Sequence, residues 1–433
     1  MTRTTIRSED ISAGQVKSAD LASGAVPEFD DSILQDNIAL LGFKMAVNDS
    51  LTQYGMIDGI VDEFHDESGV DTGNSTNLTY DATSDYYTGY TSGTTTHTWT
   101  SPGSTASWSP PANTVSGVVK AFGAYGSGQG HGTSYGGIVV ATIPLSSSNA
   151  YKLHVGYLGS DNYNDPSAGQ ENWQSSTDGG GLSGIFSGDG AFDFDNSSSN
   201  GADTQSRALV IAAGAGGWSH YHYGCHGSSQ AAGGNVTSSG GSGTGSGSSS
   251  GTQTYMKGGN GASGGGGGYY GGNAGGTNPN GGNSGTNFVY SGATSTTTNS
   301  GLAHTSDPDQ PPSDPGHGKV HIVTTQQAAL DITMQSNAFT AQSAPSKIRA
   351  VVFEEDVDTV TINTDFKLYV SRDGGTNWSQ ITLADEGDYA TGKQIWSGEV
   401  DVSGQPSDTS VKYKITTHNT KQCRIHGVSL SWS

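Results

Sequence analysis

Basic residues, cysteine and long apolar runs are all scarce in this sequence. The 18 lysines and arginines stand against 40 acidic residues, and the net charge of −22 argues against a nucleic-acid partner held through its phosphates. The two cysteines, Cys225 and Cys423, lie far apart in different segments, so the sequence predicts no disulfide framework. Assembly in a reducing cytoplasm is the simplest interpretation.

Membrane and export signals are missing as well. No apolar run approaches the ~20 residues that a membrane-spanning helix needs. The first residues lack the basic and then apolar segments of a signal peptide. We therefore expect neither a membrane anchor nor export by the ordinary secretory route.

Only 32% of the 433 residues are hydrophobic, although the chain is long enough for two or three domains. An ordinary apolar core cannot hold so much of this chain, which points to repeats, backbone lattices or oligomerisation. Glycine is what the chain has in excess, because region 122–290 contains 45 of the 67 glycines. The stability of this region therefore has to be explained without large side chains.

Glycine at this density allows two outcomes. One is a disordered tether, and the other is an array of extended polyglycine II segments with three residues per turn. Such segments have no internal hydrogen bonds, so their backbone groups must pair with neighbouring segments that only glycine lets come close. Short apolar or aromatic runs interrupt the glycines at 138–140, 153–155, 185–186, 209–213 and 288–290, and they favour the ordered array.

The order of these pieces carries a resemblance. The segment reads VVKAFGAYGSGQG, GGIVVATIPLSSSNAYKLHVGYLG, DGGGLSGIF, RALVIAAGAGG and GGNGASGGGGGYYGGNAGG. It resembles the glycine-rich domain of the anaplastic lymphoma kinase ectodomain, which implies a small β part around a bundle of polyglycine II helices. In composition it is also similar to the distal tail-fibre adhesins of T-even-like phages. The serine-rich tract 233–251 departs from this pattern, and its order is left open.

The N-terminal residues contain a short repeat. Ile11-x-x-Gly14-x-Val16 recurs ten positions later as Leu21-x-x-Gly24-x-Val26. A ten-residue period with one glycine favours a fibrous or intertwined β segment, and a disordered leader is the alternative. Similar repeats open many phage tail-fibre proteins at their virion-proximal end, so the resemblance implies that residues 1–30 attach to the particle.

Residues 31–67 show a helical period. Apolar residues recur at spacings of 4, 3 and 4, and a second row of apolar residues lies beside them. This pattern predicts an amphipathic helix, which association into a short parallel trimeric coiled coil would stabilise. We expect Ile57, Ile60, Val61 and Phe64 to continue this pattern. The alternative is a helix packed on its own chain. The residues predicted to mediate oligomerisation are Leu34, Ile38, Leu41, Met45 and Leu51.

The next boundaries follow composition. Residues 68–97 are polar and are interpreted as a linker, and 98–324 as the glycine-rich domain. We expect a strand pair at 96–99 and 115–121 at its entry and a closing strand at 320–324. From Asn37 to Tyr87, helix, acidic loop and Asn/Thr-rich segment follow one another as in the stalk of tail-fibre-like proteins of marine bacteriophages, which this part resembles.

Residues 325–433 alternate as strands do. The runs at 366–371 and 411–416 have period 2, and the apolar parity changes at Gly427, as a β-bulge would arrange. Seven or eight short strands predict a β-sandwich. With FEEDVDTVTINTDFKLYVSRDGGTNW and RIHGVSLSW, this part resembles the terminal domain of the same marine phage proteins.

The stretch 218–226 is the richest in chemistry. His220 and His222 would project to one side of a strand, so three copies around a three-fold axis, with His226 and Cys225 nearby, offer ligands for a divalent metal ion. A receptor-contact loop and a purely structural loop are the alternatives. Aromatic side chains suit contact loops because they offer large, rigid faces. The predicted receptor-binding residues are Trp173, Trp218, Tyr221, Tyr223, Tyr269 and Tyr270.

Catalytic motifs are absent from the pattern. Ser371-x-Asp373-x-Gly375-x-x-Trp378 fits a single Asp-box, which we interpret as a hairpin turn capped by the Asp side chain. No nucleophile-elbow pattern occurs, and nothing selects a pair among the many carboxylates. We expect no enzymatic activity and no organic cofactor.

Together these features predict a mainly β, fibrous and modular chain: N-terminal β repeat, trimeric coiled coil, glycine-rich domain and C-terminal β-sandwich. The resemblances imply a bacteriophage tail fibre or adhesin, assembled in the host cytoplasm and located in the virion, and the helical stripe predicts that it is a homotrimer. Its partners would be other tail or baseplate proteins at the N-terminus and a host glycan or outer-membrane protein. The alternatives are an architectural head or neck fibre without receptor binding, and a polysaccharide depolymerase.

Overall fold

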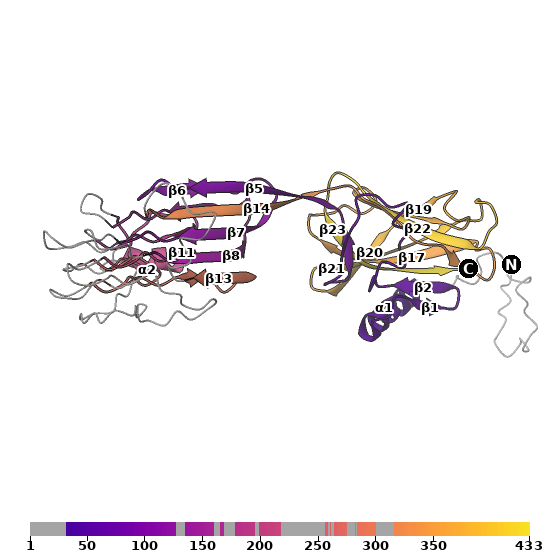
Figure 1. Cartoon of the computed structure of the whole chain (residues 1–433). Coiled ribbons are helices and arrows are strands. Elements are labelled where there is room, and N and C mark those ends of the chain that lie inside the picture. Colours follow the sequence, from indigo (N-terminus) through magenta and orange to yellow (C-terminus); the bar gives the residue numbers. More distant parts are fainter. Residues whose placement is uncertain are drawn as a thin grey trace, which may run out of the picture. The chain divides into compact units, whose positions relative to one another are not determined.

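The computed structural model is mainly β and divides into two compact units. One comprises Met1–Tyr90 and Ala329–Ser433 and is called the two-sheet unit; the other comprises Thr91–Ala328 and is called the glycine-rich unit (Figure 1). The stalk and the C-terminal domain, which were expected to be separate domains, therefore lie in one unit. The structure describes residues 32–126, 135–159, 165–168, 178–194, 199–217, 256–258, 260, 264–274, 282, 284–299 and 316–433.

The larger sheet of the two-sheet unit has eight strands. The order along its main path is β1 (Tyr54–Met56), β2 (Gly59–Asp62), β23 (Cys423–Trp432), β17 (Lys347–Asp356), β21 (Lys393–Asp401) and β20 (Ala384–Ala390). A short hairpin of β3 (Thr79–Asp81) and β4 (Tyr86–Thr88) joins through β23.

The smaller sheet has five strands. Its order is β15 (Thr333–Gln335), β22 (Ser410–Thr417), β18 (Phe366–Ser371) and β19 (Ser379–Ile381), and β16 (Phe339–Thr340) also pairs with β22.

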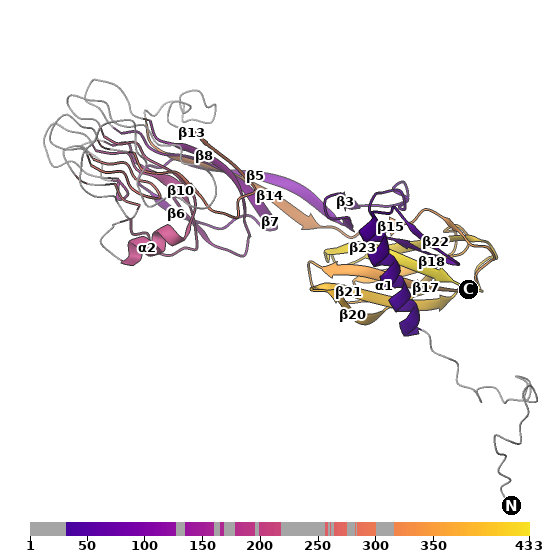
Figure 2. The same cartoon turned by 90° about the horizontal axis from the view of Figure 1, so that it is seen from below.

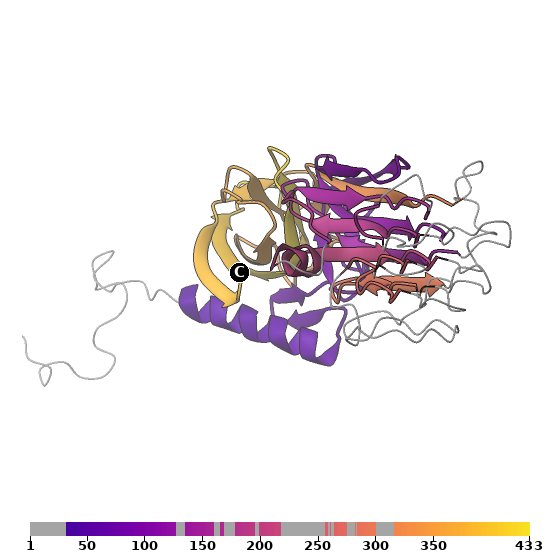
Figure 3. The same ribbon diagram turned by 90° about the vertical axis from the view of Figure 1, so that its left-hand side faces the viewer.

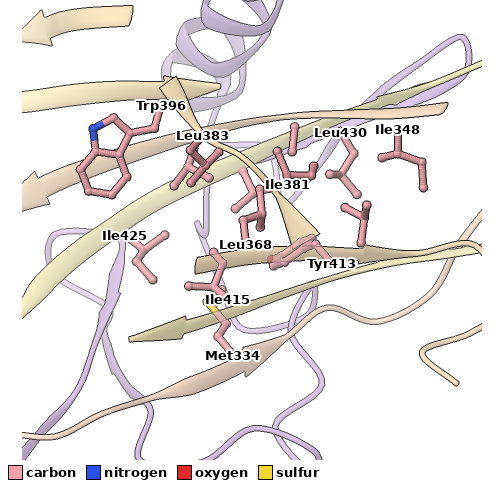
Figure 4. Packing of buried hydrophobic residues seen from close by; sticks show 14 of the residues in the cluster. Met334, Ile348, Leu368, Ile381, Leu383, Trp396, Tyr413, Ile415, Ile425 and Leu430 are labelled. Atoms are coloured by element: carbon pink, nitrogen blue, oxygen red, sulfur yellow. The ribbon is translucent and has the colours of Figure 1, made fainter. Parts of the chain in front are cut away.

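These two sheets enclose the main apolar core. Alternate residues of each strand point inward, as the period-2 runs predicted, so Ile348 of β17 and Leu430 of β23 share one cluster with Leu368 of β18 and Ile415 of β22 (Figure 4). The predicted bulge is confirmed, because the β17–β23 register shifts between Phe353 and Glu354, opposite Gly427 and Ile425.

Helix α1 (Ser32–Asp49) covers the opposite face of the larger sheet (indigo in Figures 2 and 3). Its buried residues are Ala39, Gly42, Phe43 and Ala46. The ring of Phe43 stacks on Phe353 of β17 at 4.1 Å, and Arg349 of β17 donates a hydrogen bond of 2.6 Å to Asp36. The helix thus packs on its own chain.

The expected continuation of this helix to residue 64 is wrong. Ser50 has φ of 50°, and the amide of Leu51 bonds back to the carbonyl of Ala46, which closes the helix as a C-terminal cap. Ile57 and Asp58, the latter with φ of 52°, then form a hairpin turn that directs β1 and β2 into the sheet beside β23. The segment interpreted as a linker likewise contains β3, β4 and most of β5.

The glycine-rich unit contains two five-stranded sheets. The first has the order β13 (Ser295–Asn299), β8 (Ile138–Pro144), β7 (Thr114–Phe122), β14 (Lys319–Ala329) and β5 (Tyr90–Trp99). The second has the order β12 (Phe288–Val289), β11 (Ala208–Ala212), β10 (Ser183–Ser187), β9 (Tyr151–His154) and β6 (Thr105–Trp108). The short helix α2 (Ser199–Ser206) precedes β11.

The closing strand at 320–324 is confirmed as part of the first half of β14. The expected direct pairing of 96–99 with 115–121 is wrong, because β14 lies between β5 and β7. A core of aliphatic residues, including Val119, Ile143, Leu153, Val210 and Ile322, joins the two sheets. Within the described residues, no helix is long and apolar enough to cross a membrane.

Candidate functional site at the glycine lattice

The strands of the glycine-rich unit end level with one another. In the first sheet Phe122 pairs with Ile138 and with Lys319, and Ile138 pairs with Asn299. In the second sheet the matching ends are His154 with Gly184, Ser183 with Ala212, and Ile211 with Phe288. These pairs all lie at the glycine-bearing ends of their strands. The glycine segments therefore leave both sheets at the same end of the strands (Figure 1).

Beyond these strand ends, hydrogen bonds between backbone groups join the two sheets. The amide of Ala124, which follows β7, donates to the carbonyl of Gly181 before β10, and the amide of Gly137, which precedes β8, donates to Ala213 after β11. Each of these segments therefore hydrogen-bonds to a segment that extends from the other sheet, whereas the strands pair only within their own sheet. We call this arrangement the glycine lattice; its segments are 123–126, 135–137, 155–159, 178–182, 213–217, 264–268, 282 with 284–287, and 316–318.

Segment 213–217 lies at the centre of the lattice. Its amides donate to the carbonyls of Gly267, Ala124 and Gly264, at 2.8 to 3.0 Å. Its carbonyls accept from amides of 137, 180, 282 and 285. One segment thus bonds to five others, whereas a strand in a flat sheet has two neighbours.

Close approach of backbones explains the glycines. A Cβ added to Gly214 would lie under 3.0 Å from the carbonyl of Gly180, and one added to Gly266 would lie as close to the carbonyl of Gly214. No other residue fits such a site without moving the backbone. Gly267 and Gly268 likewise have no room for a Cβ.

Aromatic and apolar side chains anchor one side of the lattice. Phe186 and Ile211 of the second sheet pack with Met256 and Phe194 in a small buried cluster. The ring of Tyr269 stacks on Phe288 at 4.0 Å and is packed against this cluster. The apolar interruptions of the sequence therefore fix the lattice to the sheets.

A buried acid also orders the lattice. Asp165 accepts hydrogen bonds from the amide of Tyr157 at 2.6 Å and from the amide and hydroxyl of Ser167, and its carboxylate lies 3.3 Å from His154 Nε2. Burial by itself raises the pKa of Asp165, but His154 and these hydrogen bonds outweigh burial and hold that pKa below its usual value. Sequence reasoning missed this pair; the turn-forming Asp165-Pro166-Ser167 was the available signal.

The far ends of the lattice segments also lie together. Tyr125 and Tyr135, on either side of range 127–134, contact edge to face at 5.0 Å. The amide of Gly159 donates to Tyr125, and the amide of Tyr125 donates to Gly316. Each of the connections 127–134, 160–164, 169–177, 218–255, 275–281 and 300–315 therefore adjoins a lattice segment at one end or at both.

The predicted receptor-contact residues fall partly within the described chain. Tyr269 and Tyr270 are half-buried and held by backbone and hydroxyl groups of Thr286, so Tyr269 also has a packing role. Trp173, Trp218, Tyr221 and Tyr223 lie outside the described residues, as do the predicted metal ligands His220, His222, Cys225 and His226. Among the residues that the structure describes, no group of three His, Cys, Asp or Glu side chains is arranged to hold a metal ion.

The predicted oligomerisation residues all lie exposed on α1 or just after it. The exposed fractions are 56% for Leu34, 48% for Ile38, 60% for Leu41, 39% for Met45 and 36% for Leu51. The 4-3-4 stripe thus faces away from the sheet, and a different row of the helix packs on the chain.

The Asp-box forms a hairpin turn between β18 and β19, as predicted. Asp373 accepts hydrogen bonds from the amide and side chain of Asn377, and Gly374 and Gly375 have positive φ. Trp378 lies under the ammonium group of Lys414 at 4.4 Å.

No family model matches the chain, and no curated protein matches it.

Proposed function

We propose that this chain is a trimeric fibre protein of a bacteriophage virion, a tail fibre or adhesin that binds a host cell-surface receptor. The observation that supports this most is that six connections each adjoin a segment of the glycine lattice. A backbone lattice bonded in several directions is a rigid base, and binding residues are often carried on loops that a rigid scaffold positions.

The connections contain the aromatic residues expected to contact a receptor. Trp173 belongs to 169–177, and Trp218, Tyr221 and Tyr223 belong to 218–255. Both ranges join the lattice, where Tyr270 is also half-buried. We infer that the lattice segments are polyglycine II helices and that the loops contact a glycan or an outer-membrane protein.

The trimer is proposed from the exposed stripe of α1. Four large apolar side chains at helical spacing, Leu34, Ile38, Leu41 and Met45, are costly to leave in water, and copies of the same stripe can cover them. Residues 1–30 would attach the trimer to tail or baseplate proteins. Three copies would offer His220, His222, Cys225 and His226 as ligands for a divalent metal ion on the three-fold axis.

Host range tests the receptor assignment. Residues 98–323 are exchanged between two phages of different host range, and the recombinant phages are plated on both hosts. We expect host range to follow the exchanged segment. If host range follows residues 328–433 instead, the two-sheet unit is the binding head; if purified protein neither binds cells nor blocks infection, the chain is an architectural fibre.

Oligomeric state tests the trimer separately. Light scattering of the native chain should give three times the chain mass of 44.3 kDa, and changing Leu34, Ile38 and Leu41 together to Ser should give monomers. A native chain that is monomeric at micromolar concentration contradicts the proposal. The double change of Thr361 and Thr382 to Ser, away from α1, serves as a control.

A further inference from the structure

The outer face of the smaller sheet in the two-sheet unit carries side chains that the proposed function does not use. Leu368 of β18 and Ile415 of β22 point into the core between the sheets. Because side chains alternate along a strand, Lys367, Tyr369 and Lys414 point to the opposite face, where all three are half-buried. This face therefore combines lysines and an aromatic ring in a chain that has few basic residues.

The register of four strands sets several of these side chains in one row. Tyr369 of β18 pairs with Lys414 of β22 on one side and with Gln380 of β19 on the other. Gln335 of β15 pairs with Lys414 and completes the row, and its side-chain amide donates to the carbonyl of Asn74 at 3.0 Å. Neighbouring strands lie about 4.8 Å apart, so the row spans about 14 Å.

The Asp-box hairpin adds a second aromatic ring to this face. The ammonium group of Lys414 lies 4.4 Å from the centre of the Trp378 ring and 4.9 Å from that of Tyr369, so it contacts both rings. Asp373 accepts hydrogen bonds from the amide and the side chain of Asn377, which fixes the turn that precedes Trp378. The rings are therefore held in place before any ligand arrives, which lowers the entropy cost of binding.

The charges on this face favour an anion. Lys367 and Lys414 make no hydrogen bond or ion pair with any residue that the structure describes. The carboxylate of Asp71 is already paired with Lys412 at 3.1 Å, and that of Asp373 is engaged in its own turn. Burial lowers the pKa of Lys414, because it disfavours the charged ammonium group. A negative group placed beside Lys367 and Lys414 would stabilise their charged forms and would displace no existing partner.

The neighbouring groups narrow the chemistry further. Aromatic rings pack against the apolar faces of sugar rings, and amide side chains such as Gln380 can both donate to and accept from sugar hydroxyls. A nucleic acid would need many more phosphate contacts than two lysines provide. Salt at 0.15 M screens the repulsion from the net charge of −22 beyond about 8 Å, so an anion in contact with the lysines is still attracted. We propose that this face binds an acidic polysaccharide, with uronate carboxylates on Lys367 and Lys414 and a sugar ring on Trp378.

This site is independent of the proposed receptor site. It lies in the two-sheet unit, outside the segment 98–323 to which the host receptor is assigned. Host range can therefore follow that segment whether or not this face binds a polysaccharide, and the two proposals fail separately.

Tri-galacturonic acid and α-1,4-galactotriose form a matched pair of probes, because they differ only in the carboxylates. Saturation-transfer NMR on the native chain at pH 7 and low salt should detect saturable binding of the acid and at least tenfold weaker binding of the neutral sugar. Lys367→Gln combined with Lys414→Gln should weaken binding of the acid at least tenfold, and Trp378→Ala severalfold. Lys347→Gln, which changes a lysine paired with Glu399 on the larger sheet, should leave binding unchanged.

The salt dependence gives a second readout. Affinity for tri-galacturonic acid should fall as the salt concentration rises, and the fall should be smaller in the double lysine variant. Thermal melting of each variant checks that it is folded. Equal binding of the two trisaccharides, unchanged binding by the folded double variant, or binding of neither probe would overturn the proposal. Equal affinity for a tri-glutamate peptide would also overturn it, because the face would then recognise charge and not a sugar.

Discussion

Both units of this chain bury polypeptide away from water, but they do so with different chemical groups. In the two-sheet unit large side chains such as Trp396, Phe366 and Tyr413 fill the space between two sheets. In the glycine lattice, segment 213–217 is buried by the backbones of its neighbours. A core of the first kind tolerates changes of shape, but a core of the second kind has no side chain that could adjust.

The largest expected effect is therefore a glycine substitution at the lattice centre. Gly214→Val would place a side chain on the carbonyl of Gly180 and separate segments that share several hydrogen bonds. We expect a loss of about 4 kcal/mol or more from the free energy of unfolding of the glycine-rich unit. Hydrogen exchange measured by mass spectrometry resolves this unit from the other.

Gly93 provides the matched control in the same unit. It lies in β5, where an added Cβ would meet only the Gln326 side chain at 3.9 Å. Gly93→Val should change stability by less than about 1 kcal/mol. Equal effects of the two substitutions would show that backbone approach does not hold the lattice together.

A smaller loss is expected for a side-chain deletion in the two-sheet unit. Leu368 is fully buried between the sheets, and Leu368→Ala leaves a cavity that costs about 3 kcal/mol. Denaturant unfolding followed by Trp fluorescence measures it. A cost below about 1 kcal/mol would mean that this core rearranges freely, and the contrast with the lattice would then be sharper still.

The same contrast explains what could be predicted from sequence. The strands at 366–371 and 410–417 and the bulge at Gly427 were predictable, because alternation of side chains reports directly on a half-buried strand. Glycine has no side chain to alternate. The composition therefore predicted that a lattice exists, but it did not predict which segments hydrogen-bond to one another. The hydrogen bonds of segment 213–217 reach residues that are distant in sequence.

The helix shows the opposite limit. Its strongest apolar stripe, from Leu34 to Met45, predicted the exposed face, whereas the face packed on the sheet uses Ala39, Phe43 and Ala46. Small residues give little periodic signal although they let a helix lie close to a sheet. Orphaned polar atoms such as Glu63 Oε1 could not be predicted either, because they depend on neighbours from several elements.

The buried acid of the lattice gives the next prediction. Asp165→Asn removes the charge beside His154 and weakens three hydrogen bonds, so we expect a loss of about 3 kcal/mol from the glycine-rich unit at pH 7. Because the folded pKa of Asp165 is depressed, its contribution is present above about pH 4 and is lost as the pH falls through the folded value.

Urea unfolding at several pH values measures this difference. The native chain and Asp165→Asn should differ most near neutral pH and converge in acid. Asp189→Asn, at an exposed site of the same unit, serves as the control. A difference that stays constant down to pH 2 would show that the Asp165 charge plays no part.

The smallest effect is a gain, and its pH dependence has the opposite sign. Glu354 of β17 is fully buried, and burial, followed by the charge and the side-chain hydrogen bond of the neighbouring Asp356, raises its pKa to about 9. Below about pH 4.5 the group is protonated in the folded and unfolded states alike. Between that pH and about 9 only the unfolded state releases the proton, so the native two-sheet unit loses stability as the pH rises.

Glu354→Gln removes this penalty, because the amide carries no charge at any of these pH values. We expect the variant to be more stable than the native chain by on the order of 2 kcal/mol at pH 7, with the gain growing toward pH 9 and vanishing below about pH 4.5. Glu399→Gln, half-exposed on β21, should show no such trend. If the gain is independent of pH, Glu354 is not the group that titrates. The stability of the two-sheet unit would then not rise in acid through this residue, and its pH dependence would not oppose that of the glycine-rich unit.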